Sequence, residues 1–234
     1  MKKTKIRSRT INVKLIIFDV DGVLIDVSQS YRLAIKKTAE FFLGKILQMS
    51  EVDEIKSMGV NNDYDASELL IQKYGKSFKK SSIIKKFQEY YLGKNFNGLI
   101  RNEKLLINEK TLRKLSKKYK LAIFTGRPRE EAFFVLERFR ISKYFDIVIS
   151  MEDVNRKKPS AEGLYKILKR LRVSPSSAVY VGDSIADVRA ANNAGIDFIG
   201  VIPPNANGVI VRNIFKRNGV NRIVKNINGI ATML

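Results

Sequence analysis

Three aspartates lie around a glycine directly after an apolar run near the start of the chain. Leu15–Phe18 has the composition of a buried strand, and Asp19, Asp21 and Asp26 follow it, with Gly22 next to Asp21. Crowded carboxylates repel one another and lose hydration when they are buried. A strand that delivers Asp19 and Asp21 together therefore indicates a site in which a cation offsets their charge.

Polar residues also follow the other apolar runs of the chain. They are Thr125 and Gly126 after Leu121–Phe124, Lys158 shortly after Ile147–Ser150, and Asp183 and Asp187 after Ala178–Val181. In open parallel α/β sheets, ligands bind at the carboxyl ends of the strands. We therefore expect these side chains to converge with Asp19 and Asp21 at one edge of a sheet.

The expected cluster contains the groups that phosphoryl transfer needs. Asp19, Asp183 and Asp187 offer the hard oxygen ligands that Mg²⁺ prefers. With the metal offsetting the negative charge, Asp19 could attack phosphorus and form an aspartyl-phosphate. Asp21 could protonate the leaving alcohol and later activate a water molecule.

Phosphate binding is expected from the residues that follow the second and third strands. The Thr125 hydroxyl and the backbone N–H groups after it, beginning at Gly126, could donate to phosphate oxygens. Lys158 would add a positive charge close to the phosphate.

The segments around these residues predict an α/β fold with a parallel sheet covered by helices on both faces. The expected strands are Val13–Phe18, Leu121–Phe124, Ile147–Ser150, Ala178–Val181 and Phe198–Val201. Helical patterns are expected between them at Leu105–Lys118, Arg129–Phe139, Ala161–Leu171 and Ile185–Ala194. This alternation is typical of right-handed βαβ units.

One long stretch interrupts the alternation. Residues 27–102 contain no convincing strand and form a far longer segment than a βα connection needs. Apolar residues at helical spacing predict helices near Tyr31–Phe42, Ser50–Met58, Asp63–Tyr74 and Ser81–Leu92. We therefore expect an inserted all-helical cap domain at 27–102 and a core domain formed by 1–26 and 103–234.

Composition excludes several kinds of chemistry. The chain has no histidine and no cysteine, so Ser-His-Asp triads, thiolate nucleophiles and His- or Cys-ligated zinc cannot occur. Acid–base catalysis must then depend on carboxylates, lysine, tyrosine or metal-bound water.

The chain is strongly basic, with 44 Lys and Arg against 23 Asp and Glu and a formal net charge of +21. This balance favours anionic partners, from small phosphates to nucleic acid. Nucleic-acid binding is possible but not favoured, because no nucleic-acid-binding motif is present and solvated basic faces are common. No apolar run approaches the length of a membrane span, and the basic N-terminus lacks the apolar stretch of a secretory signal. We expect a cytoplasmic protein with no membrane partner; its oligomeric state is not predicted.

The four polar clusters resemble the motifs of the haloacid dehalogenase (HAD) superfamily. They stand in the chain as IIFDVDGVL, LAIFTGRP, RKKPSAEGL and VYVGDSIADVRAANNAGI, in the order and at the spacing of that family. The resemblance implies a Rossmann-like core with a type-I helical cap, as in phosphoglycolate-phosphatase-like members. Lys157 lies beside Lys158, but the following Pro159 favours Lys158 as the phosphate lysine of the motif.

The resemblance also implies roles for the aspartates. Asp19 would be the nucleophile and Asp21 the acid and base, with Asp21 binding Mg²⁺ only through its backbone carbonyl. Asp183 would be a metal ligand. Asp187 would be a second ligand or an outer partner, although a first-turn carboxylate favoured by the helix dipole is an alternative.

The sequence therefore predicts a Mg²⁺-dependent phosphatase that hydrolyses a small phosphorylated metabolite. One alternative is a phosphomutase of the β-phosphoglucomutase type, and another is a basic nucleic-acid-binding protein without catalytic activity. Tyr31, Arg32 and Arg127 are weak candidates for contacts with a second anionic group of the substrate.

Overall fold

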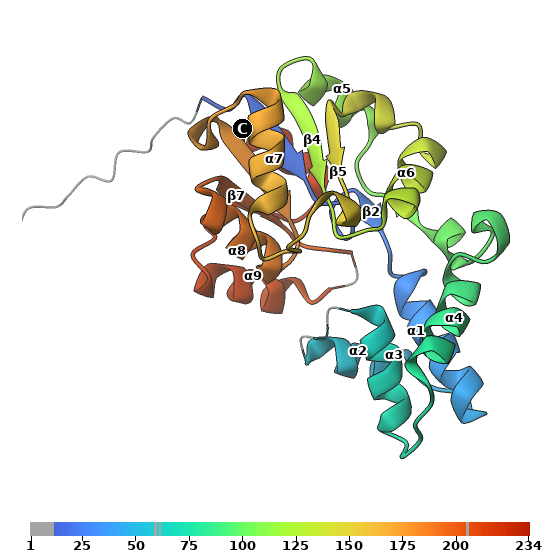
Figure 1. The fold of residues 1–234 in the computed structure, drawn as a ribbon. Helices are drawn as coiled ribbons and strands as arrows, with labels where there is room; N and C mark the ends of the chain where they lie inside the picture. Colours follow the sequence, from blue (N-terminus) through green and yellow to red (C-terminus); the bar gives the residue numbers. More distant parts are fainter. Residues whose placement is uncertain (1–11, 59, 61, 205) are drawn as a thin grey trace, which may run out of the picture. The chain divides into compact units, whose positions relative to one another are not determined.

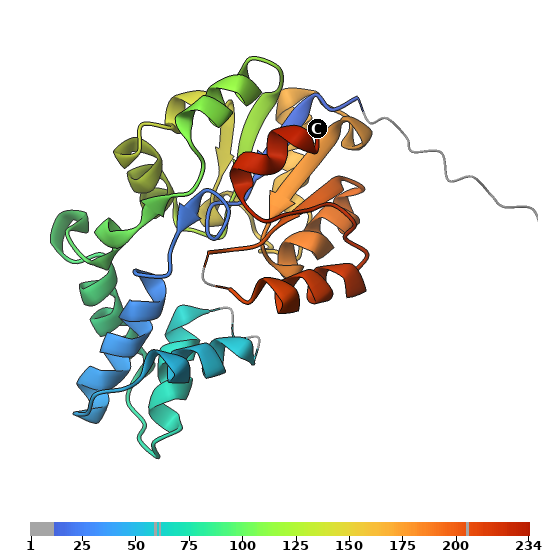
Figure 2. The same ribbon diagram turned by 180° about the vertical axis from the view of Figure 1, so that it is seen from behind.

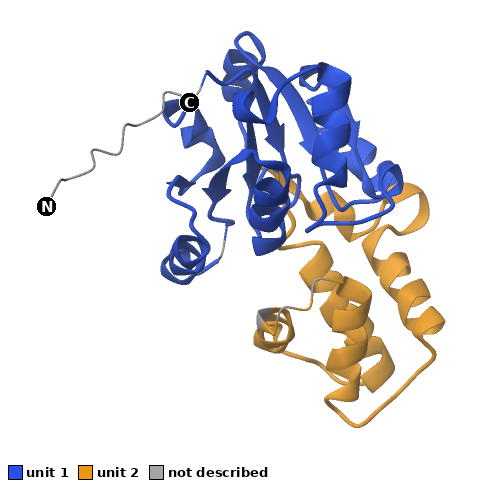
Figure 3. Cartoon of the chain, turned by 60° about the vertical axis from the view of Figure 1, so that its left-hand side comes forward, with its two compact units in different colours: residues 1–24, 106–234 blue, residues 25–105 orange. Residues whose placement is uncertain are grey.

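The computed structural model describes residues 12–58, 60, 62–204 and 206–234, and the chain divides into two units (Figure 3). Unit 1 consists of residues up to 24 together with 106–234, and unit 2 consists of residues 25–105. The basic residues noted at the N-terminus lie outside the described part of the chain. Unit 2 extends two residues before and three residues beyond the predicted cap, whose function stays a prediction.

The apolar runs of the sequence form a six-stranded sheet in unit 1 (Figure 1). Its strands lie in the order β5-β4-β1-β6-β7-β8, and every neighbouring pair is parallel. The prediction of an α/β fold with a Rossmann-like parallel sheet is thus confirmed. The strands are β1 (Leu15–Phe18), β4 (Lys120–Phe124), β5 (Ile147–Ile149), β6 (Ala178–Gly182), β7 (Asp197–Val201) and β8 (Ile223–Val224).

Helices cover both faces of this sheet, which explains why its central strands are apolar throughout. Leu15 and Ile17 of β1 pack in one core cluster with α7 and α8, whereas Ile16 and Phe18 are buried on the opposite face. Figure 2 shows α5 and the C-terminal segment on the face that α7 does not cover. The helices are α5 (Glu109–Ser116), α6 (Arg129–Arg138), α7 (Glu162–Leu171), α8 (Ile185–Ala194) and α9 (Gly208–Arg217). Short 3₁₀ helices occur at Ser142–Tyr144 (η3), Met151–Asp153 (η4), Pro175–Ser177 (η5) and Ile227–Thr232 (η6).

The register brings the ends of the central strands to one level. Phe18 of β1 lies opposite Ile123 of β4 and Val181 of β6. The residues that follow these strands continue the backbone pairing, since the Asp19 N–H donates to the Val181 carbonyl over 2.9 Å. This alignment holds the polar residues after β1, β4 and β6 at the same edge of the sheet.

Unit 2 is helical apart from a two-stranded antiparallel pair at its base. Its helices are α1 (Tyr31–Leu43), α2 (Met49–Ser57), α3 (Asp63–Gln72) and α4 (Lys80–Tyr91), followed by the 3₁₀ helices η1 (Lys94–Phe96) and η2 (Leu99–Asn102). The two strands are β2 (Ile25–Asp26) and β3 (Lys104–Leu105). Across the described residues of both units, no helix is long and apolar enough to cross a membrane.

Two parts of the sequence prediction differ from the structure. The helix expected from Leu105 begins only at Glu109, because Leu105 pairs in β3 and the Asn108 side chain caps the helix by accepting from the Thr111 N–H. Helix α9 and strand β8 were not predicted. β8 has only two residues and therefore no periodic pattern, whereas α9 has apolar residues at helical spacing, at Val211, Ile214 and Phe215, and could have been predicted.

Gly163 in α7 provides a test of the packing beside the site. A Cβ atom at this position would overlap the ring of Phe124, the last residue of β4. We predict that Gly163→Ala lowers the free energy of unfolding by about 1–3 kcal/mol, because the clash exceeds the gain in helix propensity. Urea denaturation measures this change. Gly208→Ala in α9 is the matched control, since its new Cβ would meet no atom closer than 3.7 Å and should change stability by less than about 1 kcal/mol. Equal effects of the two substitutions would contradict the prediction.

Candidate active site

Lys158 lies between two aspartates at the carboxyl edge of the sheet. Its ammonium is 2.8 Å from Oδ1 of Asp19, which follows β1, and 2.8 Å from Oδ1 of Asp187, in the first turn of α8. The Lys158 side chain is 12% exposed, and its ammonium also lies near the rings of Phe124 and Tyr180. Lys157, the other candidate, is exposed. The structure therefore brings Lys158, and not its neighbour, to the aspartates.

Asp187 is fully buried, and both of its carboxylate oxygens accept hydrogen bonds. Oδ1 accepts from Lys158 and from the Tyr180 hydroxyl, the latter over 2.7 Å. Oδ2 accepts from the backbone N–H and the hydroxyl of Ser184, and the Ser184 hydroxyl accepts from the Asp187 N–H in return. This is a capping box, the reciprocal pair that closes a helix N-terminus. Asp187 thus fixes Lys158 and the start of α8 at the same time.

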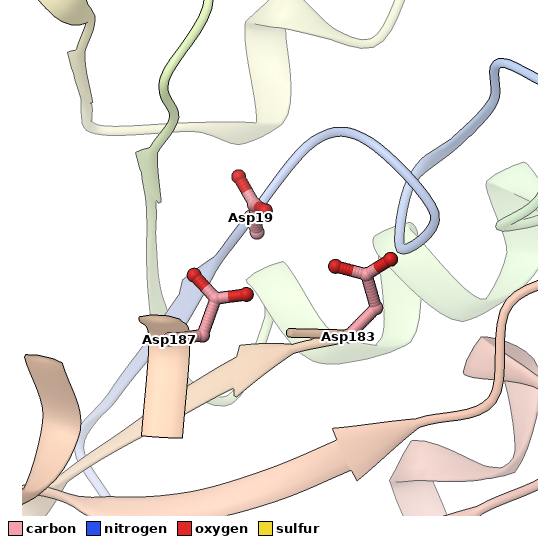
Figure 4. Close-up of side chains that lie close together, drawn as sticks. All are labelled: Asp19, Asp183 and Asp187. Carbon is pink, nitrogen blue, oxygen red and sulfur yellow. The ribbon is translucent and has the colours of Figure 1, made fainter. Parts of the chain in front are cut away.

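Asp183 completes a group of three carboxylates (Figure 4). One oxygen from each of Asp19, Asp183 and Asp187 lies within 4.8 Å of the others. Two glycines make room for them. A Cβ at Gly22, whose φ is +70°, would overlap the Asp183 carboxylate, and a Cβ at Gly182 would overlap Asp187. Only glycine fits these two positions without displacing a carboxylate.

The crowding changes the acidity of the aspartates. Burial raises the pKa of Asp19 to about 7, with the Lys158 ammonium opposing the shift and Asp187 adding to it. The pKa of Asp183 is raised by desolvation and by the neighbouring carboxylates. For Asp187, burial alone would raise the pKa, but Lys158 and the hydrogen bonds from Ser184 and Tyr180 lower it. The cluster therefore has the electrostatic character of a site that would accept a cation.

Thr125 follows β4 and is buried at the same edge. Its N–H donates to the Ile149 carbonyl, and its hydroxyl accepts from the Arg127 N–H over 3.2 Å. Gly126 between them is exposed, with open space where a Cβ would lie. The Arg127 N–H is therefore turned toward Thr125, whereas Gly126 forms the exposed part of the loop.

Asp21 and Arg127 form an ion pair that the sequence did not predict. Nε of Arg127 donates to Oδ1 of Asp21 over 2.6 Å, and a terminal guanidinium nitrogen lies 2.5 Å from the same oxygen. The Arg127 side chain has no exposed surface. Its guanidinium thus lies inside unit 1 beside Asp21, and its contact with a second anionic group of the substrate stays a prediction. The Asp21 carboxylate is not a member of the group of three.

The two candidate substrate residues of unit 2 have partners within that unit. The Tyr31 ring stacks on Tyr91 with centroids 4.4 Å apart, and the Arg32 guanidinium pairs with Asp53 on the surface. Arg32 is 44% exposed. Their role in specificity stays a prediction.

Tyr180 and Ser184 are the members of the network that sequence reasoning missed. The Ser184–Asp187 spacing is the signature of a capping box and could have been found. Tyr180 lies inside an apolar strand, where a tyrosine usually fills core volume, so its hydroxyl gave no signal.

Comparisons with known proteins identify the family of the chain. The model of the haloacid dehalogenase-like hydrolases matches residues 16–201. An imidazoleglycerol-phosphate dehydratase of Phytophthora nicotianae is 34% identical over 82% of this chain, which spans only 44% of that relative's length. A phosphorylated carbohydrates phosphatase of Thermotoga maritima is 32% identical, over 81% of this chain and 86% of the relative. A phosphoglycolate phosphatase of Aquifex aeolicus is 29% identical, over 78% and 82%.

A solved structure gives the same result for the fold. A Thermotoga maritima crystal structure provisionally assigned as a β-phosphoglucomutase superposes with a TM-score of 0.75 and is 29% identical, covering 95% of this chain and 100% of that one. The chain belongs to the haloacid dehalogenase-like hydrolases, as the four motifs predicted. Its phosphoglycolate-phosphatase-like relatives indicate the phosphatase branch of these hydrolases.

The raised pKa of Asp19 leads to a prediction about cation binding. Protons compete with a cation for a carboxylate whose pKa is about 7, so affinity should fall as the pH falls through that value. We expect Mg²⁺ to bind about tenfold more tightly at pH 8 than at pH 6, with proton release, in titration calorimetry. Asp183→Asn should weaken Mg²⁺ binding at both pH values. An affinity independent of pH would contradict the prediction.

The Tyr180 hydroxyl leads to a second prediction. Tyr180→Phe removes the donor to the buried Asp187 carboxylate and should lower the free energy of unfolding by about 1–3 kcal/mol. Tyr165→Phe is the matched control, because the Tyr165 hydroxyl donates to the Asn193 carbonyl over the same 2.7 Å but at the surface. Urea denaturation of both variants should show the larger loss for Tyr180→Phe, and a loss no larger than that of Tyr165→Phe would contradict the prediction.

Proposed function

We propose that the protein is a Mg²⁺-dependent phosphatase that hydrolyses a small phosphomonoester through an aspartyl-phosphate. The observation that carries the proposal is the arrangement of Asp19, Lys158 and Asp187, with Asp183 close by, at the carboxyl edge of the sheet. A carboxylate that is buried beside a fixed ammonium is suited to approach a phosphate dianion without prohibitive repulsion. Family membership supports the same chemistry.

Asp19 is the proposed nucleophile. Its Oδ1 is held by Lys158, which leaves Oδ2 to attack phosphorus in line with the leaving oxygen. The P–O bond to the alcohol breaks as the bond to Asp19 forms. Lys158, fixed from behind by Asp187, keeps its ammonium next to the phosphoryl oxygens as charge moves onto them.

Asp21 is the proposed acid and base. Its carboxyl donates a proton to the departing alcohol oxygen, and the resulting carboxylate then takes a proton from the water that attacks the aspartyl-phosphate. Thr125 and the exposed backbone of Gly126 are the proposed phosphate-binding groups of the β4 loop.

The donor set fits Mg²⁺ in part. Asp19 and Asp183 offer carboxylate oxygens of the kind this ion prefers, together with the proposed backbone carbonyl of Asp21. Both oxygens of Asp187 already accept hydrogen bonds, so we assign Asp187 to Lys158 and not to direct coordination. When bound, Mg²⁺ supplies positive charge that offsets the carboxylates and the phosphate.

A small phosphorylated sugar or metabolite is the proposed substrate class, which the names of the phosphatase relatives support. Unit 2, an inserted helical unit, is the proposed cap that limits substrate size. A cytoplasmic location stays a prediction from the sequence.

A phosphomutase is the second candidate, favoured by the likeness to the Thermotoga maritima structure. In this case the aspartyl-phosphate returns its phosphoryl group to a sugar phosphate. A sugar bisphosphate that activates isomerisation, with little release of inorganic phosphate, would favour the mutase over the phosphatase.

Hydrolysis of p-nitrophenyl phosphate and of a panel of phosphorylated metabolites tests the proposed function. We expect turnover with Mg²⁺, none with EDTA, and a loss of at least about a thousandfold in Asp19→Asn, because the nucleophile is removed. Acid-quenched wild-type protein should carry hydroxylamine-sensitive phosphate that Asp19→Asn lacks.

Asp146→Asn is the matched control for this substitution. The Asp146 carboxylate accepts from the Leu121 N–H away from the carboxyl edge, and its loss should leave the metal dependence unchanged. Full activity in Asp19→Asn would contradict the proposed mechanism, and wild-type inactivity across the panel would contradict the phosphatase function.

A further inference from the structure

Arg127 and Asp21 form a contact whose geometry is more specific than charge neutralisation requires. Two nitrogens of the guanidinium, Nε at 2.6 Å and a terminal nitrogen at 2.5 Å, engage the same oxygen of Asp21, Oδ1. A usual bidentate pair would place one nitrogen on each carboxylate oxygen. Here both contacts use Oδ1, so Oδ2 is the oxygen that can face a second molecule.

The two partners differ sharply in exposure. The Arg127 side chain is fully buried, whereas the Asp21 side chain is 35% exposed. The Arg127 backbone is also anchored, since its carbonyl accepts from the Met151 N–H and its N–H donates to Thr125. A buried and anchored guanidinium is a rigid support, and the exposed carboxylate is the part that can meet another molecule.

We propose that Arg127 is a positioning residue for Asp21: it holds Oδ1, so that Oδ2 faces the oxygen that exchanges the proton. This inference rests on the proposed function and assigns a role that the motifs do not give to this residue. In the first step the proton on Oδ2 passes to the leaving alcohol oxygen as its bond to phosphorus breaks. In the second step Oδ2 takes a proton from the attacking water, which restores the acid.

This role should appear as a dependence on the leaving group. A poorly basic leaving oxygen, as in p-nitrophenyl phosphate, departs with little help from an acid, whereas the more basic oxygen of phenyl phosphate needs protonation. Loss of Arg127 should therefore affect phenyl phosphate much more. A residue that only stabilises the fold would affect the two esters equally.

The experiment measures kcat/KM for both esters at saturating Mg²⁺ in five proteins and one control. They are the wild-type protein, Arg127→Gln, Arg127→Lys, Asp21→Asn and the double variant Asp21→Asn/Arg127→Gln. Lysine keeps the charge but cannot donate from two nitrogens of a planar fork, so it should restore only part of the activity. Arg129→Gln is the matched control, because this exposed arginine two residues away pairs with Asp153.

We expect Arg127→Gln to lower kcat/KM about 100-fold for phenyl phosphate and less than tenfold for p-nitrophenyl phosphate. In the Asp21→Asn background the same substitution should change kcat/KM less than about threefold, because Arg127 acts through Asp21. Arg129→Gln should behave as the wild-type protein with both esters.

An equal loss with both esters, or an undiminished loss in the Asp21→Asn background, would overturn the positioning role while leaving the phosphatase function intact. Wild-type inactivity on the esters and on the metabolite panel would overturn the proposed function and this inference together. If Arg127→Gln does not fold, Arg127→Lys takes its place, and the two esters are compared with this substitution alone and together with Asp21→Asn.

Discussion

The buried ammonium of Lys158 is the interaction on which the site depends. Three carboxylates within 4.8 Å of one another, at the edge of an apolar sheet, would repel and would each lose hydration. Lys158 contacts two of them at 2.8 Å and so joins the loop before α7 to the end of β1 and the start of α8. Burial would disfavour its charge, but the two carboxylates raise the pKa of Lys158, which stays protonated. The Lys158 ammonium thus offsets part of the negative charge of the cluster and fixes the positions of Asp19 and Asp187.

The rest of unit 1 serves this arrangement through backbone geometry. Parallel pairing in register brings the ends of β1, β4 and β6 to one level, and Gly22 and Gly182 leave the space that the aspartates fill. Asp187 belongs to the capping box of α8, and this helix packs on β6 and β7. Positions that determine stability and positions that contact the proposed phosphate are therefore neighbours, and substitutions near this edge will affect both.

Much of the candidate site could be predicted from the sequence because its residues directly follow strands. Asp19, Thr125 and Asp183 come directly after apolar runs, and parallel strands bring such residues together whatever their distance in the sequence. The ion pair of Arg127 with Asp21 could not be predicted, since spacing gives no direction for a long side chain. The same holds for Tyr180, whose hydroxyl reaches Asp187 only because β6 and α8 pack at one particular distance. Strand β8 was missed because two residues carry no period.

The two ends of unit 2 are tied to each other before they enter unit 1. β2 pairs with β3, and the next residues continue the pairing, since the Leu106 N–H donates to the Leu24 carbonyl over 2.8 Å. The chain therefore leaves and re-enters unit 1 at neighbouring positions, and the short pairing of β2 with β3 sets the distance between them. Residues between β2 and β3 can therefore be inserted, deleted or replaced while the points at which the chain leaves and re-enters unit 1 keep their separation.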